Sequence, residues 1–280
     1  MKNKRRIKDS IMYALIALSV VITLLLVVGI IGFVLYKGIG NISIELLTGT
    51  PSALKDTVGI LPYILNTLYL VLLSIIIALP LGVGAAIYLN EYATIKPLVR
   101  VIELATEALA GLPSILYGLV GMLFFARLLG LQTSLLSGSL TLVIMILPTI
   151  IRTSQEALAT VPNSYREGAQ GLGATKWYML RTIILPSSID GIVTGCILAI
   201  GRIVGESAAL LFTAGVGSVI ADNIFKSFAS SGGSLAVALY VYAFERADFD
   251  TGFAIAAVLI ILVLIINYAA KRAGKGLRAK

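Results

Sequence analysis

The sequence predicts an all-α integral membrane protein with six transmembrane helices, and three observations lead to that prediction. Of the 280 residues, 58% are hydrophobic and only 13% are charged, which is about half the charged fraction of an ordinary soluble domain. The apolar residues lie in long uncharged runs, as segments that cross a lipid bilayer require. Clusters of lysine and arginine stand before the first run and after the last, an arrangement that fixes orientation in a membrane.

The first two spans are expected in the first third of the chain. Residues 11–36 carry no charge. This run is longer than the apolar region of a signal peptide, about 7–15 residues, and it has no clear small-residue cleavage site. The second span is centred on residues 68–86, where Pro80 is followed by Gly82 and Gly84. Proline kinks a helix and glycine permits close packing, so Pro80 is expected to be a structural kink.

The third span is expected at residues 101–126 and the fourth at 135–151. The third contains Gly111 and Pro113, and we expect Pro113 to act as a second kink that shapes helix packing. Glu107 lies in the first turns of this helix. Two interpretations of that carboxylate remain open, a residue of the pore or gate and a side chain that reaches to the membrane interface.

The fifth span is expected at residues 191–214 and the sixth at 251–270. Both chain ends are strongly basic, so both termini are expected in the cytoplasm, and the number of spans should be even. Residues 215–250 are therefore expected outside, with a short helix packed on the rim. The resulting organisation is a cytoplasmic basic tail at 1–10, a transmembrane domain at 11–270 and a second basic tail at 271–280.

A polar segment, residues 154–188, separates the fourth and fifth spans. Ser164 and Glu167 have the spacing of a capping box, which predicts a helix that starts at Ser164. Gly171 and Gly173 should end that helix or turn the chain. An interfacial amphipathic linker is the simpler interpretation of such a segment.

A second short helix is expected to begin near Thr175 and to be stopped by Pro186. Ser187 and Asp190 would then cap the fifth span. The prediction is therefore a helix, a turn and a helix that lie parallel to the membrane on the cytoplasmic side.

The spacing within this segment resembles the EAA loop of ABC-importer permeases. The matching residues are Glu167, Gly168, Ala169, Gly173, Ile183, Leu185 and Pro186. Gly168 stands where the family more often has alanine. In that family the loop carries a helix that docks on the ATPase subunit. The resemblance implies a docking surface that consists of Tyr165, Arg166, Glu167, Gly168, Ala169, Gly171 and Gly173. The sequence has no G-x-x-x-x-G-K-[S/T] phosphate loop, so ATP and magnesium would be used by a separate polypeptide.

Two charged residues, Arg202 and Glu206, lie four apart within the expected fifth span. On one helix they share a face with Thr213, so we expect all three to line the substrate path. A purely structural ion pair is the alternative. An arginine fork suits a tetrahedral oxyanion. A nearby carboxylate can accept a hydrogen bond from phosphate, which keeps a proton at neutral pH, but not from sulfate, which keeps none.

Residues 201–213 resemble the A-R-x-x-G-E-T-A-P-L-L-F-T segment of the phosphate-specific ABC permease subunit of the PstA type. Ser207 replaces the usual threonine and Ala209 the usual proline. Residues 109–121 resemble the third-helix segment of the same family. The resemblance implies phosphate import with a PstC-type permease, two PstB-type ATPase subunits and a PstS-type phosphate-binding protein outside the cell. It also implies a multi-pass protein of a bacterial or archaeal plasma membrane.

Other functions fit the sequence less well. A permease for sulfate or molybdate is the nearest alternative, and a secondary transporter lacks visible inverted repeats. The chain has no histidine and a single cysteine, Cys196. We therefore expect no metal site, no cofactor and no catalytic residues. The basic residues cluster at the termini without an aromatic groove, so the expected partner besides protein is membrane lipid and not nucleic acid.

Overall fold

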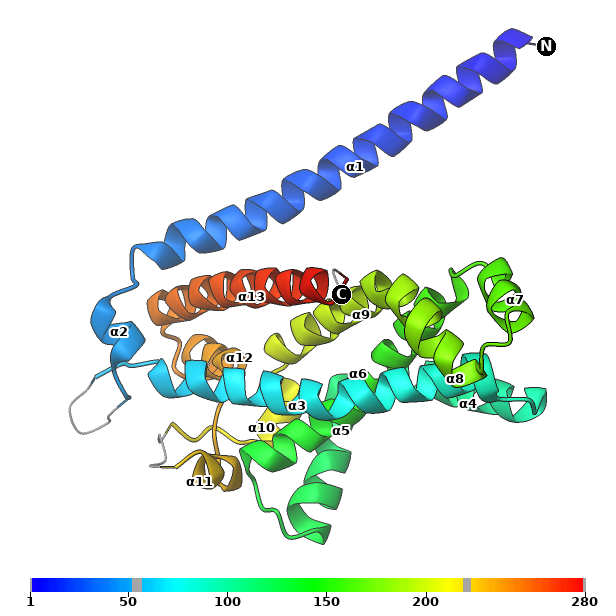
Figure 1. The fold of residues 1–280 in the computed structure, drawn as a ribbon. Coiled ribbons are helices and arrows are strands. Elements are labelled where there is room, and N and C mark those ends of the chain that lie inside the picture. The colour runs from blue at the N-terminus through cyan, green and yellow to red at the C-terminus, as the bar shows by residue number, and fades with distance from the viewer. Residues whose placement is uncertain (1, 52–56, 219–222, 279–280) are drawn as a thin grey trace.

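The computed structural model describes residues 2–51, 57–218 and 223–278, and these ranges form helices joined by short connecting segments (Figure 1). Five of the described helices are long and apolar enough to cross a membrane. A sixth crossing is present if a sharply bent pair of helices is counted as one span. The predicted all-helical membrane class is therefore confirmed.

The first long helix, α1 (Lys2–Ile39), stands partly apart from the other helices. It includes the expected span at 11–36, and the basic residues before that span continue the same helix. Only its C-terminal part packs on the last helix, α13 (Phe249–Arg278), where the Phe33 and Phe253 rings meet edge to face at 5.7 Å. A short helix, α2 (Ile44–Thr48), follows.

The second span is α3 (Leu61–Ile87), which continues through Pro80 into a π-helical turn, η1 (Tyr88–Tyr92). It packs along α6 (Leu135–Ala159), the fourth span. A Cβ atom on Gly82 would lie 2.6 Å from Cγ2 of Ile150. This glycine therefore allows α3 and α6 to approach closely, as the sequence indicated.

The third span is broken, and the prediction of one helix over residues 101–126 is wrong. α4 (Lys96–Ala110) is bent by 100° from the combined helix of α5 (Ser114–Gly121) and η2 (Met122–Leu128). Pro113 lies in the break with an extended backbone (ψ 138°), and it has no N–H to donate to α4. The Tyr117 hydroxyl donates to the carbonyl oxygen of Leu109 at 2.6 Å and joins the two halves.

The fifth span begins earlier and ends earlier than predicted. α8 (Lys176–Met179), the π-helical η3 (Leu180–Ile184) and α9 (Leu185–Val204) form one helix of 29 residues. Pro186 does not stop it, and the predicted cap by Ser187 and Asp190 is wrong.

The π-helical turn explains why the chain can pass through this proline. It changes the local hydrogen bonding, so that the N–H of Leu185 donates to the carbonyl of Leu180. Ser187 Oγ donates to the carbonyl of Ile183 at 2.6 Å and satisfies another backbone acceptor.

The segment before α13 contains short helices that do not cross a membrane. These are α10 (Ala208–Thr213), α11 (Ile224–Ala229), α12 (Leu235–Tyr240) and η4 (Val241–Glu245). Together Leu235–Glu245 form an apolar helix below spanning length, as expected for a short helix within residues 215–250.

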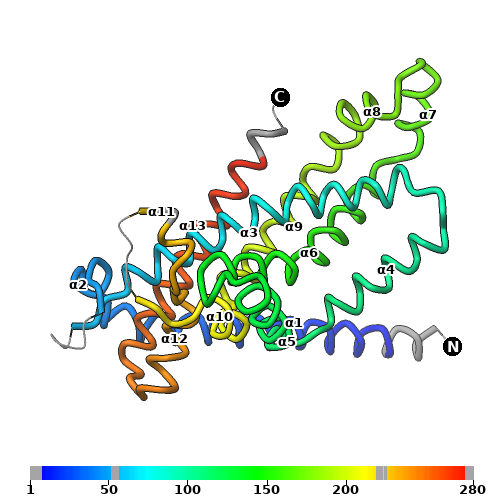
Figure 2. The backbone as a smooth tube through the Cα atoms, turned by 90° about the horizontal axis from the view of Figure 1, so that it is seen from below, coloured from blue at the N-terminus to red at the C-terminus, as the bar shows by residue number. Residues whose placement is uncertain are grey.

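Two views place the polar segment and these short helices at opposite ends of the helical bundle. α8 and α7 (Asn163–Gly171) lie at the same end as the start of α1, whereas α2, α11 and α12 lie at the other end (Figures 1 and 2). The main apolar core between them is formed by α3, α6 and α9, with side chains from α5 and α10. Of these helices, α3 reaches from α2 and α12 at one end of the bundle to η1 at the other.

Candidate functional site

The polar segment folds as two short helices, α7 and α8, joined by a tight turn; we name residues 163–179 the coupling element. α7 starts at Asn163, after Pro162, and no side chain caps it. The predicted capping box at Ser164 is therefore wrong, because the extended backbone of Pro162 already fixes the helix start. Gly173 has φ +78°, a conformation that favours glycine. Thr175 Oγ1 accepts from the N–H of Tyr178 at 3.4 Å and caps α8.

One face of the coupling element is exposed and carries large apolar side chains. Leu172 at the turn is 91% exposed, and Trp177 on α8 is 62% exposed. Most of the docking residues implied by the sequence are exposed as well: Tyr165, Glu167, Gly168, Gly171 and Gly173. This face is available to a partner.

Two residues of the expected docking surface face inward, and the expectation for them is corrected. Ala169 is buried against an apolar cluster that includes Leu158 and Ile184. The Arg166 side chain is 17% exposed and is held by groups of this chain. An i, i+3 pattern places residues 166 and 169 on one side of a helix, so the single turn of α7 that buries Ala169 also buries Arg166.

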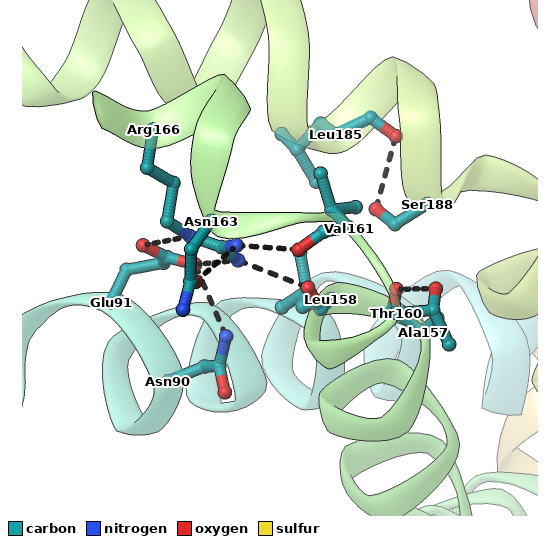
Figure 3. Close-up of polar contacts among 10 residues, drawn as sticks. All are labelled: Asn90, Glu91, Ala157, Leu158, Thr160, Val161, Asn163, Arg166, Leu185 and Ser188. Atoms are coloured by element: carbon teal, nitrogen blue, oxygen red, sulfur yellow. Dashed lines mark hydrogen bonds and ion pairs between the residues drawn. The ribbon is translucent and has the colours of Figure 1, made fainter. Parts of the chain in front are cut away.

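Arg166 joins three parts of the chain (Figure 3). Its Nη2 lies 2.7 Å from Oε1 of Glu91, whose side chain is only 5% exposed, and Nε donates to the same oxygen at 3.2 Å. Nη1 donates to the carbonyl of Val161 at 2.8 Å and Nη2 to that of Leu158 at 3.0 Å. These carbonyls lie at and just beyond the end of α6, where helices leave acceptors without partners. Asn90 Nδ2 adds a hydrogen bond to Oε1 of Glu91 at 3.1 Å.

A second contact joins the same two elements. Lys176 Nζ lies 5.0 Å from the centre of the Tyr92 ring, within the range of a cation–π interaction. The coupling element is thus fixed to η1 through both of its helices. The sequence analysis did not identify Glu91 as a functional residue. The one feature that could have indicated it is that Glu91 is an isolated acidic residue at the end of an apolar span.

The second candidate region contains Arg202 and Glu206, which the structure places on either side of a helix break. α9 ends at Val204, with Gly205 as its C-cap, so the two side chains do not lie on one continuous helix face, and the expectation of a shared face is wrong. They form no ion pair within 4.0 Å, although both are described. Glu206 is 8% exposed, and its Oε1 accepts from the N–H of Ala209 at 3.0 Å. The carboxylate therefore caps α10.

Thr213 is placed differently from the expectation. It is fully buried at the end of α10, and its Oγ1 donates to the carbonyl of Ala209 at 2.8 Å. The break at Gly205 separates it from the face of α9 that carries Arg202, so these residues form no continuous stripe. Arg202 is partly exposed and lies in the last turn of α9.

A charged cleft lies between α4 and α6. Arg152 Nη1 is 2.8 Å from Oε1 of Glu107, and Arg152 Nε is 3.3 Å from Oε1 of Glu156. The cleft has a volume of about 440 Å³, and Arg100 and Glu103 also line it. More than half of each paired side chain is exposed, so solvent screens both pairs and neither adds much to stability. The carboxylate of Glu107 is therefore paired with Arg152. This contact does not choose between a pore residue and a side chain that reaches to the membrane interface.

Comparison with known proteins gives a consistent result. Residues 78–273 match the family model described as "Binding-protein-dependent transport system inner membrane component". The chain is 34% identical over 212 residues to the probable ABC transporter permease protein YqgI of Bacillus subtilis, covering 76% of this chain and 72% of the relative. It is 31% identical over 271 residues to the phosphate transport system permease protein PstA of Pasteurella multocida, covering 95% and 94%.

Solved structures support the fold. A bacterial alginate ABC transporter in complex with its alginate-bound periplasmic protein contains a chain that superimposes with a TM-score of 0.71. The sequence identity is 15%, and the match covers 97% of this chain and 96% of the other. A chain of the MetNI methionine ABC transporter in an inward-facing conformation gives a TM-score of 0.59 at 21% identity, covering 78% and 94%.

The fold resembles that of the transmembrane subunits of type I ABC importers. More specifically, the chain belongs to the family of binding-protein-dependent transport system inner membrane components. It is accordingly a multi-pass inner-membrane permease subunit, non-catalytic and without a cofactor of its own. Its partners include an ATPase and a periplasmic binding protein.

Proposed function

We propose that this chain is the PstA-type permease subunit of an ATP-driven importer of inorganic phosphate. It would form half of the translocation path with a PstC-type permease. PstB-type ATPase subunits would dock on the coupling element, and a PstS-type binding protein would deliver phosphate from outside. The identity to PstA relatives, 31–35% in several bacteria, supports the choice of phosphate.

The observation that carries the proposal is the continuous helix from Lys176 to Val204. One end of this helix belongs to the coupling element and the other end carries Arg202. From Lys176 to Arg202 the helix rises about 39 Å at 1.5 Å per residue. Movement of a docked ATPase would therefore reach a cation in the membrane through one secondary-structure element.

The docking part of the proposal rests on the exposed face of the coupling element. Tyr165, Glu167 and Gly168 on α7 and the turn at Gly171 and Gly173 would contact the ATPase. The exposed side chains of Leu172 and Trp177 would supply apolar area, which a specific interface concentrates at its centre.

The selectivity part rests on Arg202 and Glu206. The guanidinium of Arg202 would attract the anion, and its fork would bind two phosphate oxygens. One oxygen of Glu206 is used by the backbone of Ala209. The second oxygen would accept a hydrogen bond from the P–O–H group of hydrogen phosphate. The proposed path is thus formed by Arg202 and Glu206, with Thr213 supporting α10 from inside.

The direct test is reconstitution of this chain with its three partner types in lipid vesicles. Uptake of radiolabelled phosphate and ATP hydrolysis are measured with and without the binding protein, and sulfate and molybdate serve as competitors. Phosphate uptake that requires ATP and is insensitive to a large excess of sulfate is the expected result. Equal uptake of sulfate or molybdate would refute the assignment of phosphate.

The role of Glu206 has its own test. Glu206→Gln keeps the oxygen that caps α10 but loses the negative charge and its strong acceptor. We expect the preference for phosphate over sulfate to fall roughly tenfold, the effect of about 1.4 kcal/mol. An unchanged preference in this variant would contradict selection by the carboxylate.

A further inference from the structure

The inward side of α7 makes contacts that docking on an ATPase does not explain. Arg166 turns away from the exposed docking face, and its guanidinium binds Glu91 together with the carbonyls of Leu158 and Val161 (Figure 3). Glu91 lies on η1, directly after α3. The coupling element is therefore attached to two spans, to α9 by the continuous chain and to α3 by this ion pair.

We propose that Glu91 and Arg166 are positioning residues that make α3 move with the coupling element, so that ATP hydrolysis drives transport through α3 as well as α9. The proposal rests on the function proposed above. It assigns no contact with phosphate or with the ATPase to either residue. Their ion pair would set how much transport each hydrolysed ATP produces.

The ion pair is suited to this task by its burial and geometry. Two nitrogens of Arg166 bind Oε1 of Glu91, at 2.7 and 3.2 Å. Charge-assisted bonds from a planar fork fix direction as well as distance. The Arg166 side chain is 17% exposed and that of Glu91 5%. Removal of either one would leave the other as a buried charge without a counter-charge, which is strongly unfavourable. The pair therefore holds α7 in one orientation against η1.

Lys176 and the apolar side chains around the pair strengthen the attachment. The ammonium group of Lys176 lies over the Tyr92 ring at 5.0 Å. Ala86 at the end of α3 packs in one buried cluster with Ala169 of α7 and Met179 of α8. Movement of α7 relative to η1 would disrupt all of these contacts together, so the two elements behave as one body.

The far end of α3 shows where such movement would arrive. Asn66 Nδ2 donates to the carbonyl of Gly233 at 3.1 Å, and Thr67 Oγ1 accepts from the N–H of Leu235 at 2.9 Å. These bonds hold the start of α12, at the opposite end of the bundle from α7 (Figure 2). The helix between Thr67 and Glu91 spans about 36 Å. α3 thus connects the coupling element to the segment at the opposite end.

The test uses the complete reconstituted transporter with Glu91→Gln, Arg166→Lys or a control, Glu103→Gln. The first variant keeps the shape of the side chain and loses its charge, and the second keeps a charge and loses the fork. The control makes the same exchange at an exposed carboxylate on α4. ATPase binding, ATP hydrolysis and phosphate uptake are measured for each variant.

We expect both variants to retain ATPase binding and hydrolysis, whereas phosphate transported per ATP falls roughly fivefold or more, a typical coupling effect between distant sites. Glu103→Gln should match the wild type. An unchanged ratio in the Glu91 and Arg166 variants would overturn the proposal. Loss of ATPase binding in both would also overturn it, because the pair would then serve docking.

A second measurement does not depend on the cargo. Spin labels are placed at Tyr88 on η1 and at Gln170 on α7, in a chain with Cys196→Ser, and the distance distribution between them is recorded. We expect one narrow distance in the parent and the Glu103→Gln variant and a broad distribution in the Glu91→Gln variant. A narrow, unchanged distance in Glu91→Gln would refute the positioning role even if phosphate proved to be the wrong substrate. Absence of phosphate uptake in the wild type would instead refute the proposed function alone.

Discussion

Replacement of Gly121 by alanine tests the placement of the broken span. Gly121 ends α5 where that helix crosses α6, and a Cβ atom added there would lie 2.1 Å from Oγ1, 2.7 Å from Cγ2 and 2.9 Å from Cβ of Thr141. Favourable contact between carbon atoms begins at about 3.5 Å. Rotation of the threonine side chain cannot relieve all three clashes, because its Cβ is fixed to the backbone.

The expected cost follows from this geometry. Inserting a methyl group into a well-packed site costs about 1–3 kcal/mol, and Gly121→Ala should lie at the upper end of that range because α5 and α6 must separate. Thr141→Ala removes Oγ1 and Cγ2 but leaves the 2.9 Å contact with Cβ. The double variant should therefore recover part of the loss, with a coupling energy of about 0.5–3 kcal/mol.

The assay is reversible unfolding of the purified chain in mixed detergent micelles, followed by circular dichroism. Gly84→Ala is the matched control, because a Cβ atom at Gly84 meets no atom within 4 Å. Alanine is the better helix former by about 1 kcal/mol, so this control should be neutral or stabilising. If Gly121→Ala were as stable as Gly84→Ala, or if Thr141→Ala gave no recovery, the α5–α6 crossing described here would be refuted.

Three further predictions concern function and local stability. Arg202→Gln should reduce phosphate uptake at least tenfold, because a charge-assisted hydrogen bond contributes about 1.5–3 kcal/mol, while membrane insertion, measured by fractionation, stays normal; wild-type uptake would contradict a role in the anion path. Gly173→Ala should weaken co-purification with the ATPase, because φ +78° costs a non-glycine residue roughly 1–2 kcal/mol; equal recovery of the ATPase would argue against a turn that must keep this shape. Tyr117→Phe removes the hydroxyl that donates to the Leu109 carbonyl, so the free energy of unfolding should fall by about 0.5–1.5 kcal/mol in the unfolding assay. An unchanged free energy of unfolding would show that this hydrogen bond does not stabilise the bent span.

The long spans could be predicted from the sequence because their signal is composition. Residues 11–36, 135–151 and 251–270 lie within α1, α6 and α13. A bilayer selects for uninterrupted apolar length, which needs no knowledge of neighbouring helices. The positions at which helices extend beyond the apolar core could not be read in this way, since they depend on contacts with other elements.

The broken helices were harder to predict, and for a physical reason. Gly111 and Pro113 predicted a kink, but a bend of 100° depends on what α5 packs against. At Gly205 a signal was present, because a glycine followed by Glu206 and Ser207 is compatible with one helix end and one helix start. The apolar residues on both sides obscured it. In the fifth helix the error was the reverse: Pro186 was expected to end a helix, but the helix continues through it. The sequence does not show that a π-helical turn will accommodate this proline.

The candidate site was predicted in part. The turn at Gly173 followed from the need for a glycine in a left-handed conformation. The inward direction of Arg166 did not, because its partner Glu91 is 75 residues away in the chain. Contacts of that kind arise only when distant spans pack together.

The π-helical turn at Leu180–Ile184 also fixes the rotational phase between the two ends of its helix. One residue added to or removed from an α-helix turns everything beyond it by about 100°. A single-residue deletion between the coupling element and Arg202 would therefore aim the guanidinium at a different neighbour, although both ends would keep their local structure. Related chains should accept insertions readily in the connecting loops and only in whole turns between residues 180 and 202.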